Sequence, residues 1–247
     1  MPNLKLTLEY DGTEFHGFQR QPARGGLRTV QGELERCFSR LLRETIKVIG
    51  AGRTDAGVHA TGQVVSFRTS RPIPAARLPK VLNGALPADV QVQNCEEVED
   101  GFHARRDARS RTYRYTVIER ERPSPLLGRY ALIVPGRLDA AEMGRAARPL
   151  AGRHDFRAFQ GGGSETKSTE RRLMRLDCAR KGRTVTITAE ADSFLYQMVR
   201  IMVGALLAVA RGELGQEDLL AALADGDRRR LPGPAPACGL CLVQVSY

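Results

Sequence analysis

The segment that spans residues 50–60, GAGRTDAGVHA, concentrates the side chains of this chain that are most suited to chemistry. A cation, a carboxylate and an imidazole, contributed by Arg53, Asp55 and His59, stand among glycines and alanines. Such small neighbours let a substrate approach the backbone closely. The alternative is a polar turn in which Asp55 caps the loop and Arg53 pairs with it. Composition alone favours the turn, and the spacing does not decide between the two.

A second candidate is Arg200, the only charged residue in the apolar segment 194–210. An unpaired cation inside an apolar helix would cost several kcal/mol, so we expect Arg200 to pair with a carboxylate. A third candidate is a basic run that leads into the segment around Tyr113 and consists of Arg105, Arg106, Arg109, Arg111 and Arg114. Several of these arginines are expected to bind a nucleic-acid backbone, and the alternative is a solvated basic face.

The hydrophobic pattern predicts the elements that must position these residues. In the first half it predicts strands near 4–10, 46–49, 64–67 and 90–92, and helices at 30–42 and 75–86. Thr29 is a plausible N-cap of the first helix. The segment 50–60 therefore lies between two predicted strands, and the order of the elements is β-α-β-β-α-β.

The second half repeats this order. The pattern predicts a strand at 112–118, a helix that begins at Asp139 with the capping box Asp139–Glu142, a hairpin of 173–179 with 184–191, an apolar helix at 195–210, a short helix at 217–224 and a last strand at 239–247. Such a split βαβ order is that of the ferredoxin-like unit. We predict an α+β protein of two ferredoxin-like halves with antiparallel sheets, residues 1–104 and 105–247, and a basic cleft between the halves.

Charge indicates the class of partner. The chain has 247 residues, with 38 Lys and Arg against 28 Asp and Glu, which leaves a formal charge of +10. Most of the cations are arginines, which bind phosphates with two parallel hydrogen bonds and stack on bases. The sequence therefore predicts a nucleic-acid partner.

Composition also argues against other classes. The five cysteines are odd in number and scattered, which does not suggest a disulfide framework. Cys238 and Cys241 form a C-x-x-C pair without further ligands, so no metal site is predicted. The apolar segment 194–210 is shorter than the roughly 20 residues of a membrane span, and the start of the chain lacks a secretory pattern. We expect no membrane partner and a cytoplasmic location.

The segment 50–60 also resembles a known family signature. GRTDAGVHA, followed by TGQVV, resembles the signature of the tRNA pseudouridine synthase A family. Further segments match that family in the same order along nearly the whole chain: YDGTEFHGFQRQ near residue 10, VQGELE near 30, LNGALPADV near 83, FHARRDARSRTYRY near 102 and FLYQMVRIMVG near 194. The resemblance implies two ferredoxin-like halves, a homodimer, no cofactor, and conversion of uridine to pseudouridine at positions 38, 39 and 40 in the anticodon stem-loop of tRNA.

The resemblance also assigns roles to residues. It makes Asp55 the nucleophile, which could add to the sugar or to the base, or could stabilise an oxocarbenium-like sugar. It matches Tyr113 to a tyrosine that packs on the target uracil, with core packing as the alternative, whereas Tyr115 is expected in the core. It places Arg200 beside Asp55, where the cation would keep the carboxylate ionised. The alternative is a pair between Arg200 and another acid.

Other residues of the motif are open to two interpretations. Arg53 and His59 flank Asp55, and Arg105 begins the basic run, so each could contact phosphate or the flipped nucleotide. Arg53 and His59 could equally brace the loop. Phe18 departs from the family, which often has tryptophan there.

Two rival functions follow from the same residues. A base-excising N-glycosylase would also flip a nucleotide and use an aspartate near C1′, but it would release free uracil. A non-catalytic RNA-binding module of two RRM-like halves would share the ferredoxin-like order. The aromatic RNP1 pattern of such modules is absent from the sequence.

Overall fold

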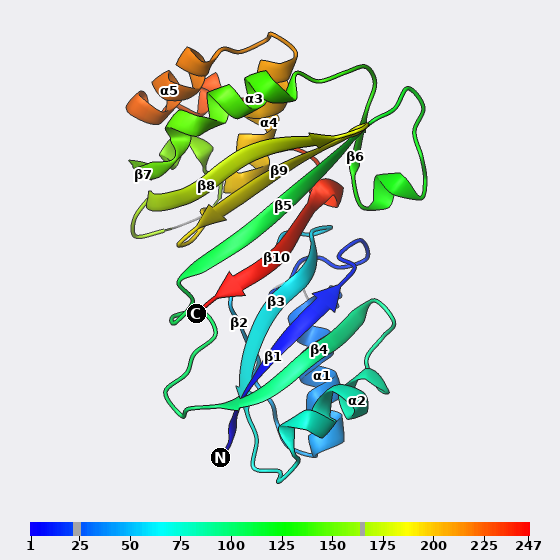
Figure 1. Ribbon diagram of the computed structural model, residues 1–247. Helices are drawn as coiled ribbons and strands as arrows, with labels where there is room; N and C mark the ends of the chain where they lie inside the picture. Colours follow the sequence, from blue (N-terminus) through cyan, green and yellow to red (C-terminus); the bar gives the residue numbers. More distant parts are fainter. Residues whose placement is uncertain (22–25, 164–165) are drawn as a thin grey trace. The chain divides into compact units, whose positions relative to one another are not determined.

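The structure is a computed structural model that describes residues 1–21, 26–163 and 166–247 (Figure 1). The chain divides into two compact units, of which unit 1 comprises Met1–Arg109 with Cys241–Tyr247 and unit 2 comprises Ser110–Leu240. Helices and mainly antiparallel strands alternate in both, so the α+β class is confirmed. The division into ferredoxin-like halves stays a prediction.

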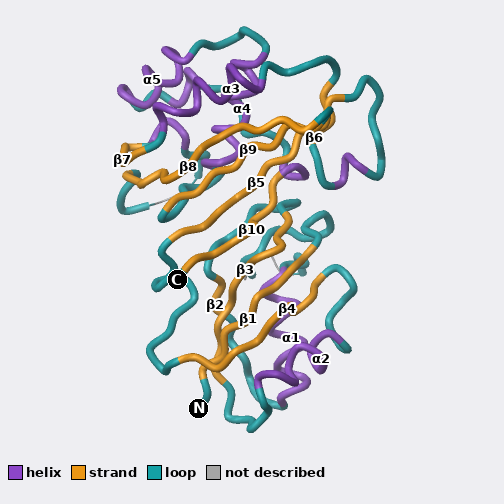
Figure 2. The backbone as a smooth tube through the Cα atoms, in the orientation of Figure 1, coloured by secondary structure: helices purple, strands orange, loops and turns teal. Residues whose placement is uncertain are grey.

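Unit 1 contains a sheet that is covered by two helices. Its elements are β1 (Asn3–Tyr10), α1 (Val30–Leu42), β2 (Ile49–Gly50), β3 (His59–Arg68), α2 (Leu78–Asn83), β4 (Val90–Val98) and β10 (Leu240–Ser246). The strands follow the order β4-β1-β3-β10, and β2 lies beside β3 (Figure 2). β1 is antiparallel to β3 and β4, whereas β10 runs parallel to β3.

Buried and more exposed side chains alternate along β1, and the buried ones form part of the core of this unit. Leu4, Leu6 and Leu8 are buried, whereas the side chains between them are more exposed, which is the period of a strand with one covered face. α1 extends over the predicted residues and is capped by Thr29, whose hydroxyl accepts a hydrogen bond from Gly32 N. Its apolar face brings Phe38 to 5.1 Å from the ring of Phe67 on β3.

Two predicted elements of this unit are shorter in the structure. The strand predicted at 46–49 is reduced to β2, since Ile46 N donates to Ser39 Oγ and Val48 N donates to Glu35 Oε1. The helix predicted at 75–86 becomes a 3-10 turn followed by α2. α2 ends where the Asn83 side chain pairs with both backbone groups of Val92 on β4.

Unit 2 also has one sheet and a group of helices. Its elements are β5 (Ser110–Glu119), β6 (Leu132–Val134), α3 (Ala140–Ala147), β7 (Gly152–Asp155), β8 (Glu170–Lys181), β9 (Thr184–Ala191), α4 (Met198–Ala210) and α5 (Gln216–Asp225). The strands follow the order β5-β9-β8-β7, and β6 runs parallel beside β5. Figure 1 shows the three helices gathered on the same face of this sheet.

The helices of unit 2 begin where the sequence provides a signal. The Asp139 side chain accepts a hydrogen bond from Glu142 N, as the predicted capping box requires. α4 starts at Met198 rather than at 195, because Gln197 has a left-handed backbone with φ of 57°. Most of the side chains of α4 are buried, as expected for a helix that is apolar on all sides.

The unit boundary in the structure differs from the boundary drawn on the sequence. Element order placed the boundary at 104/105 and the last strand in the second half, whereas Cys241–Tyr247 packs with unit 1. Pairing explains the difference, since Cys241 and Leu242 lie opposite His59 and Ala60 on β3. Tyr247 Oη also donates a hydrogen bond to Ala104 O. Periodicity predicts a strand but does not say which sheet it joins.

Candidate active site

Asp55 lies in the loop between β2 and β3, and this loop is held by the segment that follows β1. Asp55 is half-buried, and its carbonyl accepts a hydrogen bond from Val58 N at 3.2 Å, which closes a tight turn. Phe18 N donates to Thr54 O on one side of Asp55, and Gly57 N donates to Phe15 O on the other side. The backbone on both sides of the carboxylate is therefore fixed.

Two glycines allow these segments to approach one another. A Cβ added to Gly12 would lie 2.0 Å from Val58 O, and a Cβ added to Gly17 would lie 2.9 Å from Thr54 O. Gly17 also has a φ of 91°, which other residues rarely adopt. The loop around Asp55 therefore requires glycine at both positions.

Buried side chains of the sheet form hydrogen bonds with the loop that carries Asp55. The hydroxyls of Tyr10 and Thr54 are hydrogen-bonded at 2.8 Å, and Gln63 Nε2 donates to Gly52 O at 2.8 Å. Burial raises the pKa of Tyr10 to about 12, although its hydrogen bonds to Thr54 and Gln63 act in the opposite direction. Tyr10 is therefore a neutral hydroxyl at physiological pH, and it serves to orient Thr54.

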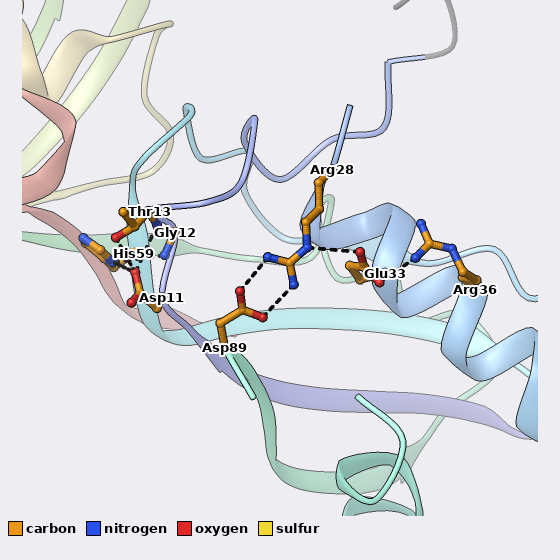
Figure 3. A network of polar contacts seen from close by, with 8 residues as sticks. All are labelled: Asp11, Gly12, Thr13, Arg28, Glu33, Arg36, His59 and Asp89. Atoms are coloured by element: carbon orange, nitrogen blue, oxygen red, sulfur yellow. Dashed lines mark hydrogen bonds and ion pairs between the residues drawn. The ribbon is translucent and has the colours of Figure 1, made fainter. Parts of the chain in front are cut away.

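His59 begins β3 and lies beside Asp11 and Gly12, which follow β1 (Figure 3). Its side chain is 7% exposed, and Nδ1 accepts a hydrogen bond from Gly12 N at 3.0 Å. Asp11 Oδ1 lies 3.2 Å from the same nitrogen, but an ion pair there would need a proton on Nδ1, which the bond from Gly12 excludes. Asp11 Oδ1 accepts instead from the backbone and the hydroxyl of Thr13. His59 is therefore bonded to the segment that follows β1, and its contact with a substrate stays a prediction.

Arg28 fixes the far end of the same segment (Figure 3). Its guanidinium makes two hydrogen bonds to the carboxylate of Asp89, at 2.6 and 2.8 Å, and a third to Glu33 Oε1 at 3.2 Å. Asp89 raises the pKa of Arg28 through these bonds. The guanidinium also lies 4.2 Å from the ring centre of Phe15, whose carbonyl binds Gly57. Arg28 therefore links the turn before β4 to the loop of Asp55.

Arg53 and Arg105 both belong to unit 1, although they are far apart in the sequence. Both side chains are exposed, and Ala104, which precedes Arg105, is buried and donates its backbone N–H to Ser66 Oγ. Desolvation lowers the pKa of Arg53, and the nearby Arg105 cation lowers it further. Arg53 therefore lies within electrostatic range of a second cation.

Tyr113 and Tyr115 lie on β5 in unit 2 and share one buried face, as predicted. Tyr115 is fully buried and its hydroxyl donates to Pro236 O at 2.8 Å, so it belongs to the core as expected. Tyr113 is 7% exposed and meets Phe194 edge to face, with ring centres 5.3 Å apart. Contact between Tyr113 and a base stays a prediction.

Arg200 lies in the first turn of α4 and is half-buried. Its Nε donates to Ala235 O at 2.8 Å, and Ala235 N donates back to Arg200 O at 2.9 Å. Its positive charge lowers the pKa of Cys238 and of Tyr115, whereas burial, the larger effect, raises both. A cation at a helix N-terminus opposes the helix dipole, which adds to the reasons to expect a carboxylate partner.

The structure thus gathers Arg53, Asp55, His59 and Arg105 in unit 1, and it places Tyr113 and Arg200 in unit 2. Among the residues that it describes, no group of three or more His, Cys, Asp or Glu side chains could hold a metal ion. Nor does any helix within the described ranges have the length and hydropathy to cross a membrane.

Sequence reasoning missed the residues that brace the loop, namely Tyr10, Gly12, Gly17, Arg28, Gln63 and Asp89. Nothing in the local sequence pattern signals that Gly12 faces Val58. The segment YDGTEFHGFQRQ, which matches the family signature, contains Tyr10, Gly12 and Gly17 and is the signal that could have identified them.

The chain is similar to known proteins along its whole length. A family model described as tRNA pseudouridine synthase matches residues 7–107 and 146–247. A protein named tRNA pseudouridine synthase A from Moorella thermoacetica is 44% identical over 247 residues, which cover all of both chains. Proteins from Clostridium perfringens (tRNA pseudouridine synthase A 2) and Acetivibrio thermocellus (tRNA pseudouridine synthase A) are 39% and 40% identical, again over all of both chains. The chain belongs to the tRNA pseudouridine synthase family and is an isomerase.

Proposed function

We propose that the protein converts uridine to pseudouridine at positions 38, 39 and 40 in the anticodon stem-loop of tRNA, with Asp55 as the nucleophile. The observation that carries this proposal is the position of Asp55, which is half-buried in a loop whose backbone is hydrogen-bonded on both sides. A fixed and partly desolvated carboxylate is suited to attack or stabilise one defined carbon. The names of the relatives support tRNA uridine as the substrate class.

The reaction is an isomerisation and needs no co-reactant. The N1–C1′ bond of uridine breaks, the uracil rotates, and a C5–C1′ bond forms in its place. The C5 proton leaves to solvent and N1 gains a proton, so atoms and charge balance. Asp55 holds the sugar or the base between the two steps, and it is released unchanged when C5 binds C1′.

The other residues act on the RNA around this carboxylate. The paired cations of Arg53 and Arg105 bind a phosphate near the flipped nucleotide. His59 supports the loop, and its contact with the substrate is part of the same proposal. Tyr113 packs against the uracil, since base and aromatic rings stack readily. Arg200 pairs with Asp55, an assignment that rests on the resemblance and on the need of a helix-borne cation for an acid.

Incubation with tRNA labelled with tritium at uridine C5 tests the reaction, because pseudouridine formation expels that hydrogen. The purified protein should release tritium to water in buffer without added metal or nucleotide, and no free uracil should appear. Asp55→Asn should abolish the release while the affinity for tRNA stays within about threefold, since the shape of the side chain is kept. Loss of activity without loss of binding also separates an enzyme from a binding module.

Two outcomes would overturn the proposal. Free uracil would indicate an N-glycosylase, and full tritium release by Asp55→Asn would remove the carboxylate from the chemistry. A set of tRNAs that each keep a single uridine at 38, 39 or 40 tests the positions. Each should be modified, and a tRNA without uridine at all three should not.

Further parts of the proposal concern architecture. Each unit is an elaborated ferredoxin-like half, the site is completed in a basic cleft between the halves, and the protein acts as a cytoplasmic homodimer. Sedimentation equilibrium at micromolar concentration should give twice the chain mass of 27.2 kDa. A protein mass of one chain, both with and without tRNA, would contradict the proposed homodimer.

A further inference from the structure

A pocket in unit 2 concentrates arginines that neither the candidate active site nor the core uses. It has a volume of about 610 Å³, and it is lined by residues from the end of β5, from the segment after β6 and from the turn between β8 and β9. Its arginines are Arg120, Arg122, Arg137, Arg180 and Arg183. Among the described residues that line it, the acids are Glu119 and Glu121, so this lining has a formal charge of +3.

One of the five arginines organises the floor of the pocket. Arg180 donates to both oxygens of Glu119, at 2.5 and 2.7 Å, and Glu119 also accepts from Leu138 N at 2.7 Å. Glu119 is 7% exposed, and the Arg180 guanidinium holds the pKa of this carboxyl below its usual range. This ion pair joins β8 to β5, and it leaves the other arginines to form the wall.

Backbone bonds fix the segments that carry the wall. Arg120 N donates to Val134 O at 2.8 Å, and Glu119 N donates to Arg183 O at 2.8 Å. Glu121 Oε1 accepts from Gly136 N at 3.1 Å. The three segments are thus tied together at the end of the sheet, so the positions of the arginine backbones are set by the fold.

The other four arginines of the pocket are the reason to expect a ligand from outside the chain. Arg120, Arg122, Arg137 and Arg183 are exposed, and among the described residues the one interaction that their side chains show is the electrostatic attraction between Arg137 and the Glu119 carboxylate. Four cations that converge on one pocket repel one another, and an anion would relieve this repulsion. None of the lining residues that the structure describes is aromatic, so a stacked base is not the natural ligand of the pocket. Arginines without aromatics favour contact with successive phosphates of a nucleic-acid backbone.

We infer that this arginine pocket is a second RNA-binding site that holds the phosphate backbone of the tRNA substrate, apart from the nucleotide that reacts. The inference rests on tRNA as the substrate, as proposed above, but not on the chemistry assigned to Asp55. Phosphate contacts position an RNA without reading its sequence, so the pocket contributes affinity and orientation rather than base choice.

A double variant, Arg122→Ala with Arg183→Ala, tests the pocket. Both side chains are exposed and unpartnered among the described residues, so the fold should tolerate their loss. The Kd for tRNA should rise about tenfold at moderate salt, and the slope of log Kd against log salt should fall by roughly 0.7 to 0.9 for each phosphate contact removed. Tritium release at saturating tRNA should keep its rate, because the variant loses only binding.

The matched control is Arg145→Ala with Arg153→Ala. These two exposed arginines belong to the same unit and change the net charge equally, but each is paired with a glutamate outside the pocket. The control should bind tRNA with the Kd and salt slope of the parent, and Arg122→Lys with Arg183→Lys should retain most of the slope. Equal Kd values and slopes for the pocket variant and the control would overturn the inference. That result would leave the Asp55 proposal standing, because the tritium assay tests the latter separately.

Discussion

Tyr10 shows how one buried hydroxyl couples the candidate active site to the stability of the protein. Burial raises its pKa from 10 to about 12, so the stability that it contributes is present below pH 10 and is lost as the pH rises toward 12. Two pKa units correspond to about 2.7 kcal/mol. Tyr10→Phe should lower the free energy of unfolding by about 1 kcal/mol at pH 8. The variant should also lack the part of the decrease in unfolding free energy at high pH that the ionisation of Tyr10 causes.

Urea unfolding of the parent and of Tyr10→Phe between pH 8 and 11.5 provides the measurement. The difference in unfolding free energy should shrink and then change sign as the pH passes 10. Cysteines with raised pKa values, such as Cys95, titrate in both proteins and cancel in the difference. Parallel pH curves for the two proteins would show that the folded state does not raise the pKa of Tyr10.

Substitution of Arg200 tests its proposed role beside Asp55. If its guanidinium stabilises the Asp55 carboxylate and the charge that develops on the sugar, Arg200→Met should lower kcat by about 10²-fold, as the loss of a preorganised electrostatic partner does in other enzymes. Arg200→Lys should restore part of the rate, because it keeps the charge without the bidentate geometry. Thermal melting checks the fold, since Arg200 Nε also binds Ala235 O. Unchanged turnover in a folded Arg200→Met protein would contradict the catalytic role.

Elements approach one another closely around the Asp55 loop, and glycine permits this approach. Gly12→Ala would place a methyl group 2.0 Å from Val58 O, a backbone atom that cannot move without shifting the loop. We expect a loss of roughly 2 to 4 kcal/mol of unfolding free energy and at least a tenfold lower kcat. Chemical denaturation and single-turnover tritium release measure the two effects.

Gly144→Ala is the matched control, because Gly144 lies within α3 and a Cβ there would meet no other atom within 4 Å. Alanine should raise helix stability by about 0.5 to 1 kcal/mol and leave activity unchanged. If Gly12→Ala behaved like Gly144→Ala, the close approach of the two segments would not limit either folding or catalysis.

Most elements could be predicted from the sequence, because they depend on local periodicity. α1 matches its predicted bounds, and the capping hydroxyl of Thr29 was identified from its type and place alone. The strand at 46–49 was wrong in extent, because its backbone donors bind side chains of α1, which no local pattern reveals. The type and place of Asp55 in its loop were likewise predictable, whereas the ties from Tyr10, Gly12 and Arg28 depend on contacts between distant segments.

At the scale of the whole molecule, the chain returns to unit 1 at its end. β10 pairs with β3, and the Tyr247 ring receives the Lys5 cation 4.7 Å from its centre. Arg109 N donates to Ser246 O at the point where unit 1 gives way to unit 2. The first unit is thus complete only when the last residues of the chain have been added, which couples the folding of its sheet to contacts of long sequence separation.

Substitution of Leu242 tests whether the pairing of β10 with β3 stabilises unit 1. It is fully buried and lies opposite Ala60 on β3, so Leu242→Ala should cost about 2 to 5 kcal/mol through the cavity that it leaves. Hydrogen exchange should show the loss first in the amides of β1 and β3, whereas β8 and β9 of unit 2 should keep their protection. Gln244→Ala on the same strand is the control, because this exposed side chain should cost less than about 0.5 kcal/mol. Faster exchange confined to β8 and β9 would instead assign the last strand to the second half, as its place in the sequence suggests.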